Sequence, residues 1–261
     1  MEEKDAKKIV REGYAEVAQG RSSCCCGPSA SCCGGGTAET LSKNLGYSDR
    51  ELSAVPDGVN LGLGCGNPLA FAGLRPGETV LDLGSGAGFD CFLAAKGVGP
   101  QGRVIGVDLT PEMIAKAGEN AKRSGYRNVE FRVGEIEKMP IEDNSIDVVI
   151  SNCVINLAPN KAQVFREIHR VLKPGGRMLL SDIVLLEELP PEVRDSDPAY
   201  IGCIAGAMLK DDYLRLLREA GFEDAAVKEA TSSGIEHMQN MAGDGKDVIQ
   251  SIKVGATKTV R

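Results

Sequence analysis

Three isolated cysteines stand where a thiol can do chemistry. Cys65 lies between two glycines in the loop 60–68, so the backbone can bend tightly there and we expect its sulfur to be exposed. Cys153 ends a predicted strand, and ligands of open α/β sheets bind beyond the carboxyl ends of strands. The neighbours of Cys203 are small and apolar, which fits a buried core cysteine as well as a functional thiol. Thiols at such positions indicate soft-ion binding or redox chemistry.

Five further cysteines crowd into the low-complexity segment 22–37, whose serines and glycines cannot build a core. They are Cys24, Cys25, Cys26, Cys32 and Cys33. The segment is either a disordered linker that happens to be rich in thiols or a mobile arm that binds thiophilic ions. A disulfide scaffold does not fit, because the nine cysteines are odd in number and the domain is too large to need one.

A glycine-rich turn after a buried strand predicts a ligand pocket. The strand 80–83 runs into three glycines at alternate positions, Gly84, Gly86 and Gly88. Such a turn lets the backbone approach a ligand closely, although a tight turn without a ligand also fits. The next predicted strand, 103–108, ends on Asp108, an acid placed to accept both hydroxyls of a ribose. We therefore expect a nucleoside, although neither the G-x-G-x-x-G dinucleotide spacing nor a P-loop is present.

The pattern D-x-G-x-G-x-G, followed by an acid at the end of the second strand, resembles the class I S-adenosylmethionine-dependent methyltransferases. In that family the glycine turn lies under the methionine part of the cofactor, and the second acid holds the ribose. The resemblance implies that these parts correspond here to Asp82, Gly84, Ser85, Gly86, Gly88 and Asp108. It also implies adenine contacts from Glu135, Ile136 and Met113, although Met113 fits core packing equally well. Asn152 borders Cys153 and can hydrogen-bond cofactor or substrate.

The residues around the cysteines make the resemblance more specific, to one family within the class I methyltransferases. Three separated thiolates suit a trigonal-pyramidal ion with a lone pair, such as trivalent arsenic, whereas structural zinc prefers four ligands. The segments around Cys65, Cys153 and Cys203 are similar to the arsenite methyltransferases, over nearly the whole chain. The resemblance implies that these three cysteines bind trivalent arsenic, as arsenite or its thiol conjugates. It also implies a redox role for an N-terminal cysteine, Cys32 or Cys33, with glutathione or thioredoxin as the thiol reductant. The cysteine run at 24–26 leaves that last choice open.

Alternating strands and helices must position these residues. Apolar runs predict strands at 129–133, 146–153 and 177–183 and closing strands at 222–230 and 249–258. Helices are expected at 2–19, from Thr110 onward, at 161–172 and at 209–220, with a sharp turn at 173–176.

The order of these elements predicts an α/β fold with a Rossmann-like, doubly wound, mostly parallel sheet and a smaller C-terminal α+β part. We expect an N-terminal helix and cysteine-rich flexible arm at 1–59. A methyltransferase core at 60–185 should bind the cofactor, and residues 186–261 should complete the sheet and the arsenic site.

Composition limits the partners. The chain has 261 residues, of which 42% are hydrophobic and 26% charged, as in an ordinary soluble globular protein. Its net charge of −7 argues against a nucleic-acid partner. No apolar run approaches the roughly 20 residues needed to cross a membrane. The charged residues 1–4 lack a signal-peptide core, so we expect a cytoplasmic location.

Two other functions fit parts of the sequence. A methyltransferase acting on carbon, oxygen or nitrogen of a small molecule would have the same fold, but its thiols would be idle. A thiol-rich metal-binding protein that is not an enzyme would need neither Asp82 nor Asp108. The chain has only two histidines, His169 and His237, and an arsenic lone pair needs no general base.

Overall fold

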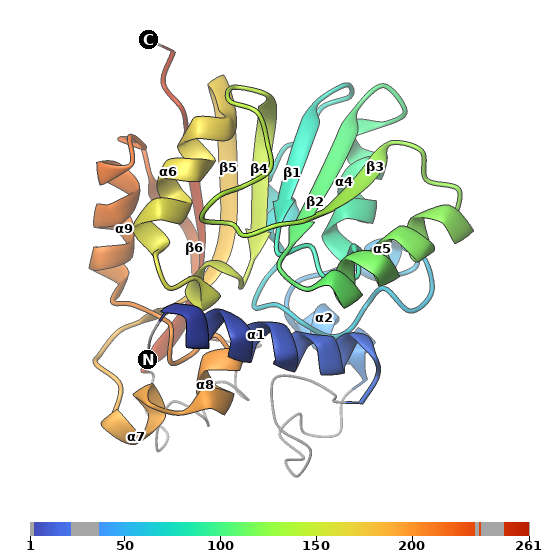
Figure 1. Ribbon diagram of the computed structural model, residues 1–261. Helices are drawn as coiled ribbons and strands as arrows, with labels where there is room; N and C mark the ends of the chain where they lie inside the picture. Colours follow the sequence, from blue (N-terminus) through green and yellow to red (C-terminus); the bar gives the residue numbers. More distant parts are fainter. Residues whose placement is uncertain (1–2, 22–36, 233–234, 236–247, 261) are drawn as a thin grey trace.

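Seven strands form one sheet at the centre of the computed structural model, which describes residues 3–21, 37–232, 235 and 248–260 (Figure 1). The strand order is β3-β2-β1-β4-β5-β7-β6, and β7 runs antiparallel to both of its neighbours. This confirms the predicted Rossmann-like, mostly parallel sheet. The strands are β1 (Thr79–Leu83), β2 (Arg103–Asp108), β3 (Val129–Val133), β4 (Ile146–Asn152), β5 (Leu172–Leu185), β6 (Ala226–Thr231) and β7 (Ile249–Thr257).

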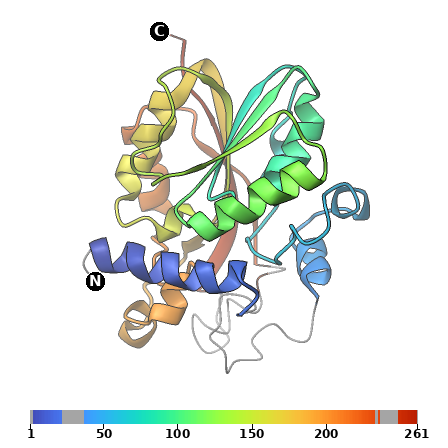
Figure 2. The ribbon, with the colours of Figure 1, turned by 45° about the vertical axis from the view of Figure 1, so that its right-hand side comes forward.

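Helices pack against the sheet and across one of its ends (Figures 1 and 2). The longer helices are α1 (Glu3–Ala18), α4 (Phe89–Val98), α5 (Pro111–Arg123), α6 (Lys161–Val171) and α9 (Lys210–Glu219). The shorter ones are α2 (Ala38–Asn44), α3 (Asp49–Leu52), η1 (Pro68–Phe71), η2 (Ile155–Leu157), α7 (Pro191–Arg194) and α8 (Asp197–Ile201). None of the described helices is both long enough and apolar enough to span a bilayer.

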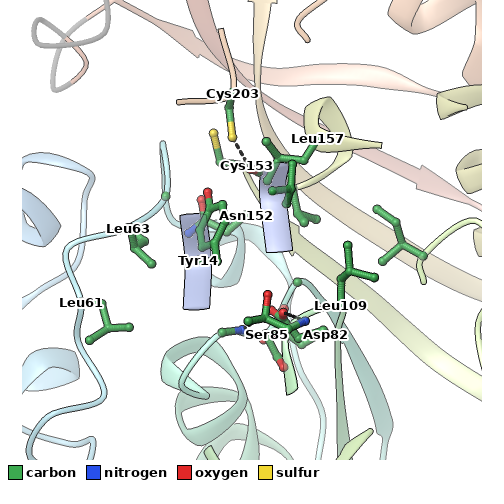
Figure 3. A pocket seen from close by; sticks show the side chains of 18 of the residues that line it. Tyr14, Leu61, Leu63, Asp82, Ser85, Leu109, Asn152, Cys153, Leu157 and Cys203 are labelled. Atoms are coloured by element: carbon green, nitrogen blue, oxygen red, sulfur yellow. Dashed lines mark hydrogen bonds between the residues drawn. The ribbon is translucent and has the colours of Figure 1, made fainter. Parts of the chain in front are cut away.

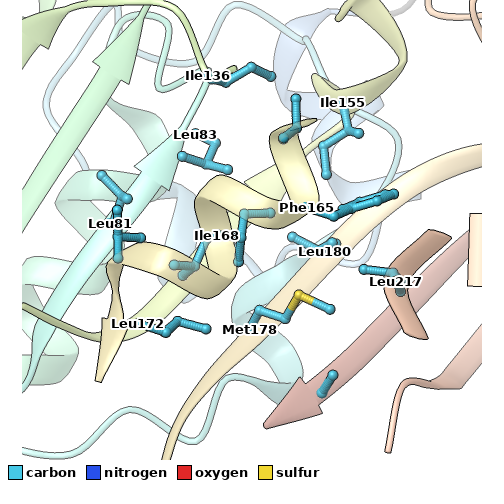
Figure 4. Close-up of a cluster of buried hydrophobic side chains, with 14 of the residues drawn as sticks. Leu81, Leu83, Ile136, Ile155, Phe165, Ile168, Leu172, Met178, Leu180 and Leu217 are labelled. Atoms are coloured by element: carbon cyan, nitrogen blue, oxygen red, sulfur yellow. The ribbon is translucent and has the colours of Figure 1, made fainter. Parts of the chain in front are cut away.

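The core is divided between the two faces of the sheet, because successive side chains of a strand point to opposite sides. Leu81 and Leu83 of β1 pack with Phe165 of α6 on one face (Figure 4). Val80 of the same strand packs with Cys91 of α4 on the other face. Burial on both faces explains why β1 reads as a nearly continuous apolar run. The helices therefore hold the carboxyl ends of the central strands in fixed positions.

Helix α1 lies across one end of the sheet and contacts α5, α8 and η2 (Figures 1 and 2). Its position agrees with the amphipathic N-terminal helix that the sequence predicts. The cysteine-rich segment that follows it falls almost entirely outside the described residues, and this includes Cys24, Cys25, Cys26, Cys32 and Cys33.

The sequence predicts a sharp turn at 173–176 that precedes a strand. This prediction is wrong, because these residues lie inside β5. Leu172 pairs with Ile146 of β4 and Arg177 pairs with Val148, so residues 173–176 stand opposite Asp147 alone. The Lys173 ammonium binds both carboxylate oxygens of Asp147, at 2.7 and 2.8 Å. The glycines thus form a bulge, and the strand continues through it.

Candidate active site

A pocket opens at the carboxyl ends of β1, β2 and β4, and α1 forms part of its wall (Figure 3). The glycine turn after β1 and Asp108 at the end of β2 line one part of it, and Cys153 and Cys203 line another. Residues Lys7, Val10 and Tyr14 of α1 and the loop 59–64 complete the wall. The residues expected to hold a nucleoside and the thiols of Cys153 and Cys203 therefore line the same cavity.

The glycine turn is held by the second acid. The two carboxylate oxygens of Asp108 accept hydrogen bonds from the Gly86 N–H at 2.9 Å and from the Thr110 N–H at 2.8 Å. Gly86 has a left-handed φ of 51°, and no atom lies within 4 Å of the place where a Cβ would stand. The buried hydroxyl oxygen of Ser85 has no hydrogen-bond partner. An open cradle with an unpartnered polar atom fits a ligand with polar groups of its own.

Two buried acids, Asp82 and Asp90, lie in this part of the pocket, and Asp90 gives it a negative charge. Burial raises the pKa of Asp82 well above its ordinary value, and the neighbouring Asp90 raises it further. Burial also raises the pKa of Asp90 to about 6, although hydrogen bonds from Tyr47 and Asn152 oppose the shift. Asp90 is therefore largely ionised at neutral pH. Such a site favours a ligand that carries positive charge.

The three isolated cysteines come together. The Cys203 thiol donates to the carbonyl oxygen of Cys153 at 2.8 Å (Figure 3). The Cys153 thiol lies within hydrogen-bonding reach of Cys203 and Cys65, and these contacts together with burial raise its pKa well above the ordinary value. Burial also raises the pKa of Cys65. At neutral pH the thiols of Cys65 and Cys153 are therefore protonated, and they lose their protons only when an ion takes their place.

An unusual backbone conformation constrains two of these cysteines, Cys153 and Cys203. Cys153 and Cys203 adopt left-handed φ values of 61° and 62°, which are uncommon for residues other than glycine. Strain of this kind is found where the surrounding structure fixes a functional side chain. In the described part of the chain no three Cys, His, Asp or Glu side chains are already arranged as a metal site.

The expected exposure of the Cys65 sulfur is wrong, since this residue is only 1% exposed. The flanking glycines bring the loop close to other backbone and side chains instead. A Cβ on Gly64 would stand 2.8 Å from the amide of Asn152, and one on Gly66 would collide with Ser181. Cys65 therefore lies behind the pocket wall, beside Cys153.

The structure places most of the other predicted residues on the pocket. Its wall includes Asp82, Gly84, Ser85, Gly86, Asp108, Glu135, Ile136 and Asn152. Gly88 caps α4 with a φ of 95° and is not part of the wall. Met113 is completely buried and does not line the pocket.

Three residues near the site were missed from the sequence: Tyr47, Asp90 and Cys91. Asp90 had a signal, because an acid in the first turn of the helix after a glycine turn lies near the pocket. The thiol of Cys91, the residue after Asp90 in the same helix turn, donates to Asp82 at 3.2 Å. Tyr47 had none, since it reaches Asp90 across 43 residues of chain.

Comparison with protein-family models gives a match to a methyltransferase domain over residues 74–221. Several curated relatives are named arsenite methyltransferase. The one from Halobacterium salinarum is 51% identical over 229 residues, which cover 85% of this chain and 59% of the relative. The one from Homo sapiens is 40% identical over 186 residues, which cover 67% of this chain and 50% of the relative. The chain thus spans about half to three fifths of these curated relatives.

A solved structure agrees with these sequences. It is the crystal structure of CrArsM, an arsenic(III) S-adenosylmethionine methyltransferase from Chlamydomonas reinhardtii. The sequence identity is 36% and the TM-score 0.64, with 85% of this chain and 73% of that chain covered.

Proposed function

Because the chain belongs to the arsenite methyltransferase family of class I methyltransferases, we propose that it transfers methyl groups from S-adenosylmethionine to trivalent arsenic. The observation that carries the proposal is the convergence of Cys65, Cys153 and Cys203 beside a pocket that also holds the glycine turn and Asp108. A methyltransferase for carbon, oxygen or nitrogen acceptors has no use for these thiols.

The cofactor fits the acid-lined part of the pocket. Asp108 retains acceptor capacity for the ribose hydroxyls, and the unpartnered Ser85 hydroxyl and the open space at Gly86 fit a polar chain laid over the turn. The ionised Asp90 carboxylate offsets positive charge on the amino and sulfonium groups. Glu135 and Ile136 remain our candidates for the adenine. When bound, S-adenosylmethionine supplies a methyl group on a sulfonium, which is an electrophile with its own leaving group.

The cysteines capture the substrate by ligand exchange. Each thiol gives its proton to a departing hydroxide or thiolate of the arsenic compound, so water or a free thiol leaves and an As–S bond forms. Three such exchanges leave arsenic with three sulfur ligands and one lone pair. Because Cys153 and Cys203 line the pocket and all three residues are buried, the ion is held away from water and beside the cofactor.

Methylation of the lone pair takes arsenic to the pentavalent state, and two electrons must return it to the trivalent state. Two thiolates supply these electrons by forming a disulfide. We propose Cys65 with Cys32 or Cys33 as this pair, and glutathione or thioredoxin as the reductant that restores the thiols. Such reductants favour the cytoplasm as the location. The net charge of −7 supports a small-molecule substrate over nucleic acid.

A binding experiment separates this proposal from its rivals. In a variant with Cys65→Ser, Cys153→Ser and Cys203→Ser, we expect affinity for S-adenosylmethionine within about twofold of wild type, since the thiols are separate from the glycine turn. Elemental analysis after gel filtration measures the number of arsenic atoms bound per chain, and this number should fall by one atom. Unchanged arsenic would point to an organic acceptor. A wild-type protein that binds arsenite but no S-adenosylmethionine would point to a sequestering protein.

A further inference from the structure

The loop that carries Cys65 is held by one side-chain amide. The Oδ1 atom of Asn152 accepts a hydrogen bond from the Cys65 N–H at 3.0 Å. Its Nδ2 atom donates to the carbonyl oxygen of Gly66 at 2.8 Å. The partners fix the direction of the amide, because a backbone N–H needs an acceptor and a carbonyl oxygen needs a donor. Asn152 therefore sets where the Cys65 thiol lies.

Two buried side chains hold this amide in turn. The Tyr47 hydroxyl donates to Oδ1 of Asp90 at 2.7 Å. The Asn152 amide nitrogen donates to the Tyr47 oxygen at 3.0 Å and to Oδ2 of Asp90 at 3.3 Å. Tyr47 and Asp90 are 3% and 7% exposed, so water does not compete for these bonds. The edge-on ring of Phe89, with centroids 4.9 Å apart, fixes the tyrosine ring.

The same network borders the cofactor region. Asp90 and Asn152 both line the pocket, and Asp90 belongs to α4, which starts at the glycine turn. By contrast, Cys153 and Cys203 are fixed by their own backbone conformation and by the bond between them. Apart from Asn152, Cys65 has the Ser251 hydroxyl on its carbonyl oxygen at 2.7 Å, the Ser181 hydroxyl 3.9 Å from its sulfur, and the Cys153 thiol within reach of that sulfur. Of the three cysteines, Cys65 is thus the one whose backbone the network holds.

We propose that Tyr47 and Asp90 are positioning residues, which hold the Cys65 thiol through Asn152 and thereby couple cofactor binding to arsenic binding. The inference rests on the proposed function. Asp90 and Asn152 line the pocket and Asn152 also holds the Cys65 loop, so a ligand on one side that favours one position of this amide favours that position for the other ligand too. Coupling of this kind is reciprocal: each ligand must raise the affinity of the other by the same factor.

The test is a binding cycle with arsenite and S-adenosylhomocysteine, the demethylated cofactor, so that no turnover occurs. Each dissociation constant is measured with and without the other ligand by titration calorimetry. For the wild type we expect a coupling factor of about tenfold, within the usual range. Tyr47→Phe loses only the hydroxyl, which weakens the link between Asp90 and Asn152. Its coupling factor should fall below about two, where a factor of one means that the ligands bind independently.

Two further variants make the result specific. Asp90→Asn keeps the size of the side chain but turns a donor toward Asn152 or Tyr47, and it should lose the coupling as well. Tyr213→Phe is the matched control, since its hydroxyl donates to another buried acid, Asp182, at 3.1 Å, and it should keep the wild-type factor. Thermal melting checks that each variant is folded.

The outcomes separate the two proposals. A wild-type protein without arsenite binding contradicts the proposed function. A wild type that binds both ligands but shows no coupling, or a folded Tyr47→Phe that keeps the full coupling factor, overturns the inference alone. A loss of coupling in Tyr213→Phe equal to that in Tyr47→Phe would also overturn it, because the effect would then follow from any buried Tyr–Asp pair.

Discussion

Replacing Cys153 with serine is expected to abolish arsenite binding at the site and to lower methylation at least about 100-fold, the usual cost of misplacing a reacting group. Cys153 is the central thiol: it reaches both Cys65 and Cys203, and its carbonyl oxygen accepts the Cys203 thiol. Serine has nearly the same shape, but its hydroxyl is a hard ligand and does not hold a soft ion. Arsenic retention and product formation measure the two effects.

Cys65→Ser should behave differently from Cys153→Ser. It should also lose methylation, because the third thiolate and its proposed disulfide are gone. It should retain weakened arsenite binding through Cys153 and Cys203. Cys91→Ser is the control for loss of a buried thiol, since a hydroxyl can still donate to Asp82, and its arsenite binding should stay at the wild-type level. Wild-type turnover in either site variant would defeat the assigned roles.

Asp108→Asn is expected to weaken S-adenosylmethionine binding by about 100-fold, while arsenite binding without cofactor stays unchanged. The amide keeps one acceptor oxygen, but the other position becomes a donor that faces the backbone N–H of Gly86 or Thr110. The turn is then disturbed and the charge that favours ribose hydroxyls is lost, at about 1.5–3 kcal/mol for each charged hydrogen bond. Equilibrium dialysis measures the change.

The exposed Asp195→Asn is the control for Asp108→Asn, because it removes one carboxylate charge away from the pocket wall. It should bind S-adenosylmethionine as the wild type does. Wild-type cofactor affinity in Asp108→Asn would contradict the assigned position of the ribose.

The sequence predicted the elements whose signals are local. The run that forms β1, the glycines after it and the acid that ends β2 lie close together in the chain, and their pattern gives the strand, the turn and the position of Asp108. The burial of Cys65 could not be predicted in this way. It depends on Asn152, Ser181 and Ser251, which the fold brings to the loop from distant strands.

Two other differences between prediction and structure also arise from contacts between distant parts of the chain. The Lys173–Asp147 ion pair and the pairing of β5 with β4 convert a local turn signal into a bulge within a strand. The left-handed backbone of Cys153 and Cys203 carries no signal, because their neighbours in the sequence do not require it. Sequence could therefore indicate which thiols belong together, whereas their burial and support follow from tertiary structure.

Arsenic speciation after incubation shows whether the protein methylates arsenic at its thiols. The protein is incubated with arsenite, S-adenosylmethionine, glutathione and thioredoxin, and the arsenic species are separated by chromatography with elemental detection. We expect methylated arsenic from the wild type, at least about 100-fold less from Cys153→Ser, and none without S-adenosylmethionine. Arsenic that stays inorganic, with a wild-type protein that binds S-adenosylmethionine normally, would contradict the assignment of the thiols and direct the search to organic acceptors.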